Sequence, residues 1–202
     1  FLHRWNNQTW RVKGSFMASR VEGTPEMLVN TQTAFEHLFQ RPDADHLDID
    51  STATSMSGHG GNFEFGKVRG NFTFATGANW RSPRLELNDI GFLTQTDLIN
   101  QYLFARYQIN QPDGLFRNYA TTFNHRLRWN FAGEHLHQSA RIGFNAEFQN
   151  FWGINLGLNR EFKDISQNAL FGGPSIRRPN GTSISFSFIP TTARPSASGG
   201  PP

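Results

Sequence analysis

Residues 135–149 carry the clearest alternation of apolar and polar side chains in the sequence. Ile142 shares its parity with the other apolar residues of this segment, whereas Arg141 shares the opposite parity with the polar ones. This repeat of two predicts a β-strand with one apolar face and one polar face. Residues 115–131 repeat the pattern over about 55 Å of extended chain. That length is unusual for a soluble strand and suits a tilted barrel strand.

Weaker copies of the alternation recur along the chain and predict further strands. They lie at residues 10–19, 57–69, 71–80, 98–109, 154–161 and 183–188. With a stub at residues 1–5, the pattern predicts a meander of eight to nine antiparallel strands within residues 1–190. Bacterial single-chain barrels use an even number of strands, so we expect nine strands to be part of a larger barrel.

The expected connections alternate between short and long. Tight turns are expected at residues 6–7, 69–71, 111–114 and 150–153, and the other connections at residues 22–56, 82–97, 132–134 and 164–181. Apart from the short connection at 132–134, this order is typical of outer-membrane barrels, which place short turns at one end and long loops at the other.

Tryptophans fall near the ends of the predicted strands. Trp5, Trp10 and Trp152 lie near the short turns, whereas Trp80 and Trp129 lie near the other end. Two aromatic girdles of this kind are expected at the two interfaces of a membrane. The alternative is that these side chains fill the core of a β-sandwich.

The composition narrows the classes of protein. Only 37% of the 202 residues are hydrophobic, and no run of 18 apolar residues occurs, which excludes a transmembrane helix but not a barrel. The absence of Cys excludes disulfides, Cys-ligated zinc and cysteine nucleophiles. The scattered basic residues predict no nucleic-acid partner. Residues 191–202, rich in Pro, Gly and Ser, are expected to form a flexible tail.

The longest connection contains a helical pattern. Thr24 is suited to cap a helix and Pro25 to its first turn, and apolar residues recur at spacings of three and four until Pro42. The expected short helix can plug the lumen, cap the pore, bind a partner or pack against its own hairpin.

A cluster of carboxylates follows this helical pattern. Its members are Asp43, Asp45, Asp48 and Asp50. Calcium takes several oxygen ligands, so the cluster is a candidate calcium site, although its spacing matches no EF-hand. The alternative is that these residues form turns and cap helices. No other cofactor is expected.

Charged residues of the polar parity are expected to line the lumen of the barrel. They are Arg11, Lys13, Glu64, Arg126, Arg128, Arg141, Glu147 and Glu161. A lining of mixed sign can tune the selectivity of a pore or form salt bridges that plug it.

His125 lies at mid-strand on the apolar parity, where a membrane hydrolase could place a general base. Ser139 has the opposite parity and would face the lumen, away from such a base. We therefore assign no catalytic residue and expect no enzymatic activity.

Several segments resemble a known family. They are Phe39-Gln40-Arg41-Pro42-Asp43-Ala44-Asp45-His46, Thr54-Ser55-Met56-Ser57-Gly58, residues 82–92 and Asn150-Phe151-Trp152-Gly153. They are similar to the C-terminal barrel domain of large outer-membrane proteins of unknown function from Bacteroidota-like lineages. The similarity runs from about residue 3 to residue 188. It implies a longer barrel, preceded by a module similar to family-nine carbohydrate-binding domains.

We therefore predict an all-β chain that forms part of an antiparallel transmembrane barrel in the bacterial outer membrane. Its expected role is non-enzymatic binding or passage of glycans or similar solutes. Its expected partners are lipid, glycans, and the remaining barrel strands or another subunit. Two alternatives stay open, namely a secreted soluble β-sandwich or fibre-forming module, and an outer-membrane hydrolase.

Overall fold

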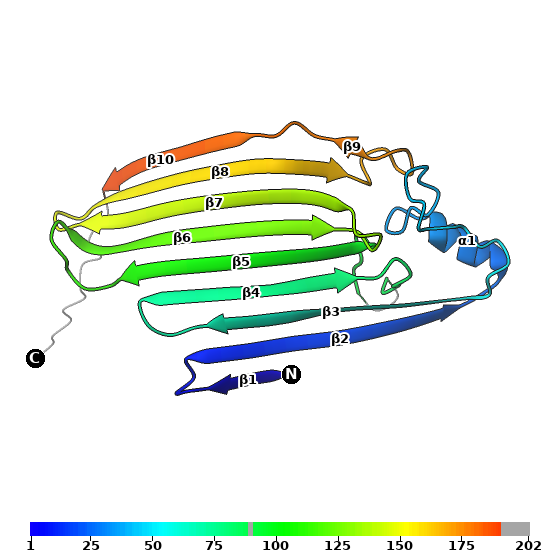
Figure 1. The fold of residues 1–202 in the computed structure, drawn as a ribbon, viewed down its shortest axis with the longest axis horizontal. Helices are drawn as coiled ribbons and strands as arrows, with labels where there is room; N and C mark the ends of the chain where they lie inside the picture. The colour runs from blue at the N-terminus through cyan, green and yellow to red at the C-terminus, as the bar shows by residue number, and fades with distance from the viewer. Residues whose placement is uncertain (89–90, 191–202) are drawn as a thin grey trace, which may run out of the picture.

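The computed structural model describes residues 1–88 and 91–190. All of its strands belong to one antiparallel sheet, ordered β1-β2-β3-β4-β5-β6-β7-β8-β10, with β9 paired to β8 (Figure 1). The strands are β1 (Leu2–Trp5), β2 (Trp10–Glu22), β3 (Ser55–Lys67), β4 (Phe72–Arg81), β5 (Leu98–Ile109), β6 (Phe116–Trp129), β7 (His135–Phe148), β8 (Trp152–Ser166), β9 (Ile176–Arg177) and β10 (Thr182–Pro190).

The predicted all-β meander is confirmed. Nine strands pair in chain order, and the two-residue β9 lies within the connection expected at residues 164–181. The sheet is open, with β1 and β10 at its two edges. The predicted tail at residues 191–202 lies outside the described residues.

The pairing register keeps the two faces distinct from strand to strand. Register partners share a face, because they lie opposite each other on neighbouring strands. One apolar row of such partners crosses the sheet and comprises Phe74, Ala105, Phe123, Ile142, Leu158 and Ile184. The alternation of each strand therefore adds up to one continuous apolar face.

Short turns gather at one end of the sheet, at the left in Figure 1. Asn6 and Asn7 have φ angles of 48° and 53°, in the left-handed region that Asn tolerates better than most residues. Their turn sets Trp5 opposite Trp10 in the register. Gly70, with a φ of 92°, serves the turn between β3 and β4, where a side chain would be strained.

The longer connections gather at the other end, with the helix α1 (Pro25–Thr33) (Figure 1). Thr24 caps this helix, as predicted, and its Oγ1 accepts a hydrogen bond from Met27 N. The helix ends at Thr33, so the pattern that ran to Pro42 overstates its length. Residues 34–41 form turns instead, since the main chain leaves helical geometry at Ala34, where ψ is 158°.

The buried core lies at this loop end, where the connections fold onto the polar side of the sheet. Leu85 is fully buried and packs against the β3 backbone, because a Cβ on Gly58 would lie 2.1 Å from Leu85 N. Other buried apolar residues of the loop end are Leu28, Leu38, Phe39, Ala44, Leu47, Met56, Leu93, Leu98 and Leu136. Burial is thus concentrated under the loops, and no second sheet of described residues contributes to it.

Candidate functional site

The charged residues predicted for the lumen share one face of the sheet. A single row of register partners crosses the sheet along this face and comprises Lys13, Glu64, Gly77, Tyr102, Arg126, Ser139 and Glu161. Arg128 and Arg141 belong to the rows on either side of it. We call this surface the polar face.

Glu64 is the centre of a compact ionic group on the polar face. Its carboxylate accepts hydrogen bonds from the Arg11 guanidinium at 2.5 Å and from the Tyr102 hydroxyl at 2.7 Å. Lys13 Nζ lies 3.4 Å from the same carboxylate. Glu64 is buried, and the positive charges of Arg11 and Lys13 balance its negative charge. This part of the face is a closed salt-bridge group rather than an open binding surface.

Arg117 makes a second ion pair near the short-turn end. Its Nη1 donates to Glu147 at 2.6 Å, and Asn118 Nδ2 donates to the same carboxylate at 2.9 Å. The β6–β7 register shifts between Phe116 and Asn118, and such a β-bulge places an extra residue in one strand. The sequence alternation did not predict Arg117 as the partner.

The middle of the polar face is hollowed. A cavity of about 880 Å³ lies mainly over β5 to β8. Its charged lining comprises Arg126, Arg128, Arg141 and Glu161, and His137 lies beside them. The cations therefore outnumber the carboxylate here, which makes the cavity attractive to anions.

The opposite face is apolar, and its tryptophans lie near the strand ends. At the short-turn end, Trp5 stacks on Trp10 at 6.5 Å between ring centroids, and Trp152 stacks on Phe188 at 4.7 Å. At the loop end, Trp80 and Trp129 lie on the same apolar face, and Trp129 Nε1 donates a hydrogen bond to Gln101 at 3.1 Å. All five predicted girdle tryptophans thus lie near the expected ends, with polar or aromatic neighbours.

Ser139 contacts a different histidine from the one singled out in the sequence. His125 lies on the apolar face beside Gln138, whereas Ser139 Oγ lies 3.1 Å from His137 Nε2 on the polar face. His137 Nδ1 in turn lies 3.4 Å from Asp164 Oδ1. A serine, a histidine and a carboxylate therefore lie in the order that a hydrolase uses.

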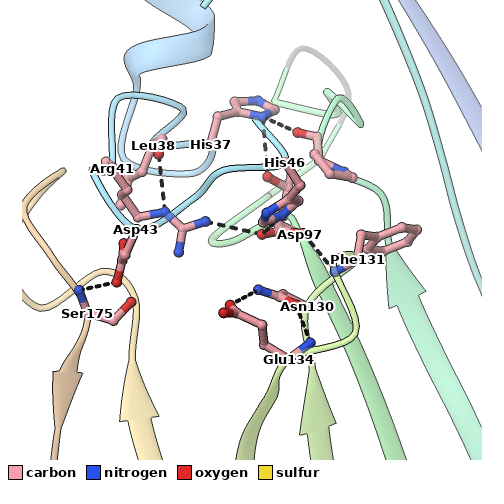
Figure 2. A network of polar contacts seen from close by, with 12 residues as sticks. His37, Leu38, Arg41, Asp43, His46, Asp97, Asn130, Phe131, Glu134 and Ser175 are labelled. Atoms are coloured by element: carbon pink, nitrogen blue, oxygen red, sulfur yellow. Dashed lines mark hydrogen bonds and ion pairs between the residues drawn. The ribbon is translucent and has the colours of Figure 1, made fainter. Parts of the chain in front are cut away.

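At the loop end, one buried carboxylate connects three segments that are far apart in the sequence (Figure 2). Asp97 Oδ2 accepts from Arg41 Nη2 at 3.1 Å and lies 2.9 Å from His46 Nε2. Asp97 Oδ1 accepts from the backbone N–H of Phe131 at 2.9 Å. The first long connection, the β4–β5 connection and the β6–β7 turn are joined at this side chain.

A second contact joins the first two of these connections. Both ring nitrogens of buried His37 contact the β4–β5 connection, with Nδ1 at 2.8 Å from Pro83 O and Nε2 at 2.9 Å from Glu86 Oε2. Burial raises the pKa of Glu86, but hydrogen bonds from the Asn88 backbone N–H and from His37 more than offset it and lower the pKa. The ionised form of Glu86 therefore favours the folded loops.

A comparison with protein families matches residues 5–183 to the family described as Domain of unknown function (DUF5916). The chain belongs to the DUF5916 family. No curated protein and no solved structure matches it. Within the described part of this DUF5916 chain, no helix is long and apolar enough to cross a membrane.

The four aspartates predicted as a calcium site have separate positions in the DUF5916 domain. Asp43 Oδ2 accepts from Ser175 N at 2.7 Å, and Asp50 Oδ1 accepts from the backbone N–H and hydroxyl of Thr52. Asp45 and Asp48 are exposed. Over residues 1–88 and 91–190, no three acidic or histidine side chains form a group able to hold a metal ion. Calcium binding stays a prediction that this geometry does not favour.

Asp43 instead links two connections that follow strands near opposite edges of the sheet. Burial raises its pKa, but the hydrogen bonds from Ser175 more than offset that effect and lower the pKa. Asp43 lies in the connection after β2, and Ser175 lies in the connection after β8. Their hydrogen bond therefore joins these two connections at the loop end (Figure 2). Hydrogen bonds from Thr52 likewise lower the pKa of Asp50.

Sequence reasoning missed the most connected residue of the DUF5916 loops. Arg41 and His46 belong to the motif at residues 39–46, which already marked them as unusual, whereas Asp97 had no local signal. Its partners His46 and Arg41 lie 51 and 56 positions away along the chain, and no periodic pattern relates such distant residues.

Proposed function

We propose that this chain forms part of the wall of a β-barrel in the bacterial outer membrane. Its apolar face contacts lipid, and its polar face lines a path for polar solutes. The proposal therefore assigns a transport or binding role and no enzymatic step to the wall itself.

The uncovered apolar face carries this proposal. Ile142, Leu158 and Ile184 are 50%, 44% and 80% exposed, although they belong to one continuous apolar row. Soluble proteins rarely expose contiguous apolar surfaces of this kind. A secreted β-sandwich would bury such a face under a second sheet, whereas all described strands belong to the one sheet. Lipid is the partner that fits this surface.

The two open edges extend the proposal to further partners. Unpaired backbone groups of a strand are costly inside a bilayer, so a membrane barrel has no free edges. We propose that β1 and β10 pair with remaining strands of the same protein or with another subunit. The resemblance described above adds a preceding carbohydrate-binding module and glycans as ligands, and this addition rests on the resemblance rather than on the sheet.

The test uses the full-length protein folded into lipid vesicles, with heat-modifiable migration in electrophoresis as the readout. Ile142→Arg places a cation on the apolar face, which costs about 2–4 kcal/mol at mid-bilayer. We expect this variant to fold into vesicles poorly. The matched control Asn145→Arg, on the polar face of the same strand, should fold as the unmodified protein does. Equal behaviour of the two variants, or solubility without detergent, would overturn the proposal.

A second candidate function follows from the contact between Ser139 and His137. In an ester hydrolase, His137 would take the proton of the Ser139 hydroxyl as its Oγ attacks the ester carbonyl, and Asp164 would orient the imidazole. The released alcohol would receive that proton, and water would then hydrolyse the acyl group from Ser139. Labelling by a fluorophosphonate probe that is lost in Ser139→Ala but kept in Ser183→Ala would support this function. An unlabelled protein would exclude it.

A further inference from the structure

Two glycines lie side by side on the polar face, where β7 pairs with β8. Gly143 and Gly157 are register partners. A Cβ on Gly157 would lie 2.5 Å from Ser185 Oγ and 3.7 Å from Arg141 Nη2, and a Cβ on Gly143 would lie 2.7 Å from Thr122 Oγ1. The glycine backbone therefore forms a floor, with the hydroxyl groups of Ser185 and Thr122 lying over it and the Arg141 guanidinium beside it.

Polar side chains border this floor on both sides along the strands. Arg141 is paired with Asn159 on one side, and Asn145 with Asn155 on the other. All four residues line the cavity described above. We call the two glycines and these four bordering residues the cradle.

Arg141 is the one cation of the cradle, and its charge is not neutralised within the described part of the chain. Its side chain is exposed, and none of the ion pairs among described residues includes it. This separates it from Arg11 and Arg117, whose guanidinium groups pair with Glu64 and Glu147. Arg141 is thus available to a ligand, whereas those two form structural ion pairs.

The chemistry of the cradle selects an oxyanion. A guanidinium presents a planar set of N–H donors that matches two oxygens of a carboxylate or phosphate. Asn159 Nδ2 donates to Glu161 and Asn155 Nδ2 donates to Ser187, so the amide oxygens of these residues suit the hydroxyl groups of a small polar solute. Arg126 and Arg128 of the same cavity add positive charge, as in pores that favour anions.

We infer that the cradle is a binding site for a small hydrophilic solute with a carboxylate or phosphate group, held by Arg141. The inference deepens the proposed function and rests on it, because a solute reaches this face only if the face lines a path. The solute's oxyanion would bind the guanidinium, and the hydroxyl groups of Ser185 and Thr122 over the two glycines would donate hydrogen bonds to it.

The experiment measures binding to the full-length protein in detergent by isothermal titration calorimetry. The probes are glucuronate, inorganic phosphate and glucose. We expect one or both anions to bind at least tenfold more tightly than glucose. The stronger of the two anions identifies the group, a carboxylate or a phosphate, that the cradle takes.

Two variants locate the site. Arg141→Gln should weaken anion binding roughly tenfold or more, the effect of losing a charge-assisted hydrogen bond. The matched control Arg160→Gln removes the same charge from β8, where Arg160 lies on the opposite face in register with Ala140, and should leave binding unchanged. Gly157→Ala should also weaken binding, because its methyl group would displace the Ser185 hydroxyl and lie 3.7 Å from Arg141 Nη2.

Failure of the inference and of the proposed function can be told apart in the same samples. Anion binding no tighter than glucose binding, or equal effects of Arg141→Gln and Arg160→Gln, would overturn the cradle while heat-modifiable migration persists. Loss of that migration in the unmodified protein would instead overturn the barrel proposal. A loss of binding in Arg141→Gln counts for the cradle only when the variant keeps its migration, and Gly157→Ala provides an independent check.

Discussion

Replacing Asp97 with Asn tests whether the buried carboxylate holds the loops together. Asp97 is 2% exposed, and the side chain of its partner Arg41 is 3% exposed. Removal of the charge leaves a buried guanidinium without a counter-ion, a change that costs about 3–5 kcal/mol in proteins. Asn retains an oxygen for the Phe131 N–H and tolerates the φ of 54° at this position. The substitution therefore isolates the charge from the backbone conformation.

The structure also predicts where this loss of stability appears. Strand pairing does not involve Asp97, so the loops should open locally while the sheet persists. A cost of 3–5 kcal/mol corresponds to amide exchange that is faster by about a hundredfold to several thousandfold. Hydrogen exchange measured by mass spectrometry on peptides from residues 34–47 and 130–134 provides the assay.

Two controls define the result that would refute this reasoning. Asp48→Asn removes a charge from an exposed position of the first long connection and should leave exchange unchanged. Asp97→Ala should destabilise the loops by about 1–2 kcal/mol more than Asp97→Asn does, because Ala in the left-handed region is strained. Exchange in Asp97→Asn within a factor of three of the unmodified protein, or equally fast exchange in the strands, would contradict a local ionic contact.

Two further predictions concern the same loops. Because the folded-state pKa values of Glu86 and Asp43 are lowered, the folded loops bind fewer protons than the unfolded ones. The stability that these two carboxylates contribute is fully present above their ordinary pKa values of 4.5 and 3.8 and is lost as the pH falls through the lowered values. Limited proteolysis of residues 34–47 should therefore accelerate in acid. The acceleration should be less steep in Glu86→Gln, which has no carboxylate to protonate at this position. Thr24→Ala removes the acceptor for Met27 N and should destabilise α1 by about 1 kcal/mol, seen as faster exchange of its first-turn amides; unchanged exchange would mean that the cap contributes nothing.

The sheet was predictable from the sequence because residues close together along the chain determine its strands and turns. The alternation around Ile142 assigns each side chain to a face, and turn residues such as Gly70 mark where the chain reverses. Antiparallel pairing of successive strands then follows, because short turns leave few other arrangements. The two faces and the positions of the tryptophans needed no knowledge of distant contacts.

The loop network was not predictable for the opposite reason. Helical spacing continued past Thr33, but buried contacts of His37 with the β4–β5 connection hold that segment in turns. The side-chain partners of Asp97 come from the first long connection, which has no period that relates it to residue 97. Likewise, the pairing of Arg117 with Glu147 depends on a bulge in β6 that no alternation pattern contains.

The unequal lengths of the connections have a consequence for the order of folding. Each hairpin from β5 to β8 closes locally, as in proteins of low contact order, which fold quickly. Closing the connection at residues 23–54 costs about 2 kcal/mol more in chain entropy than closing that at residues 149–151. We therefore expect β5 to β8 to pair first, with β2 and β3 pairing with each other late. A ligand or lipid that orders the 23–54 connection would accelerate that last step.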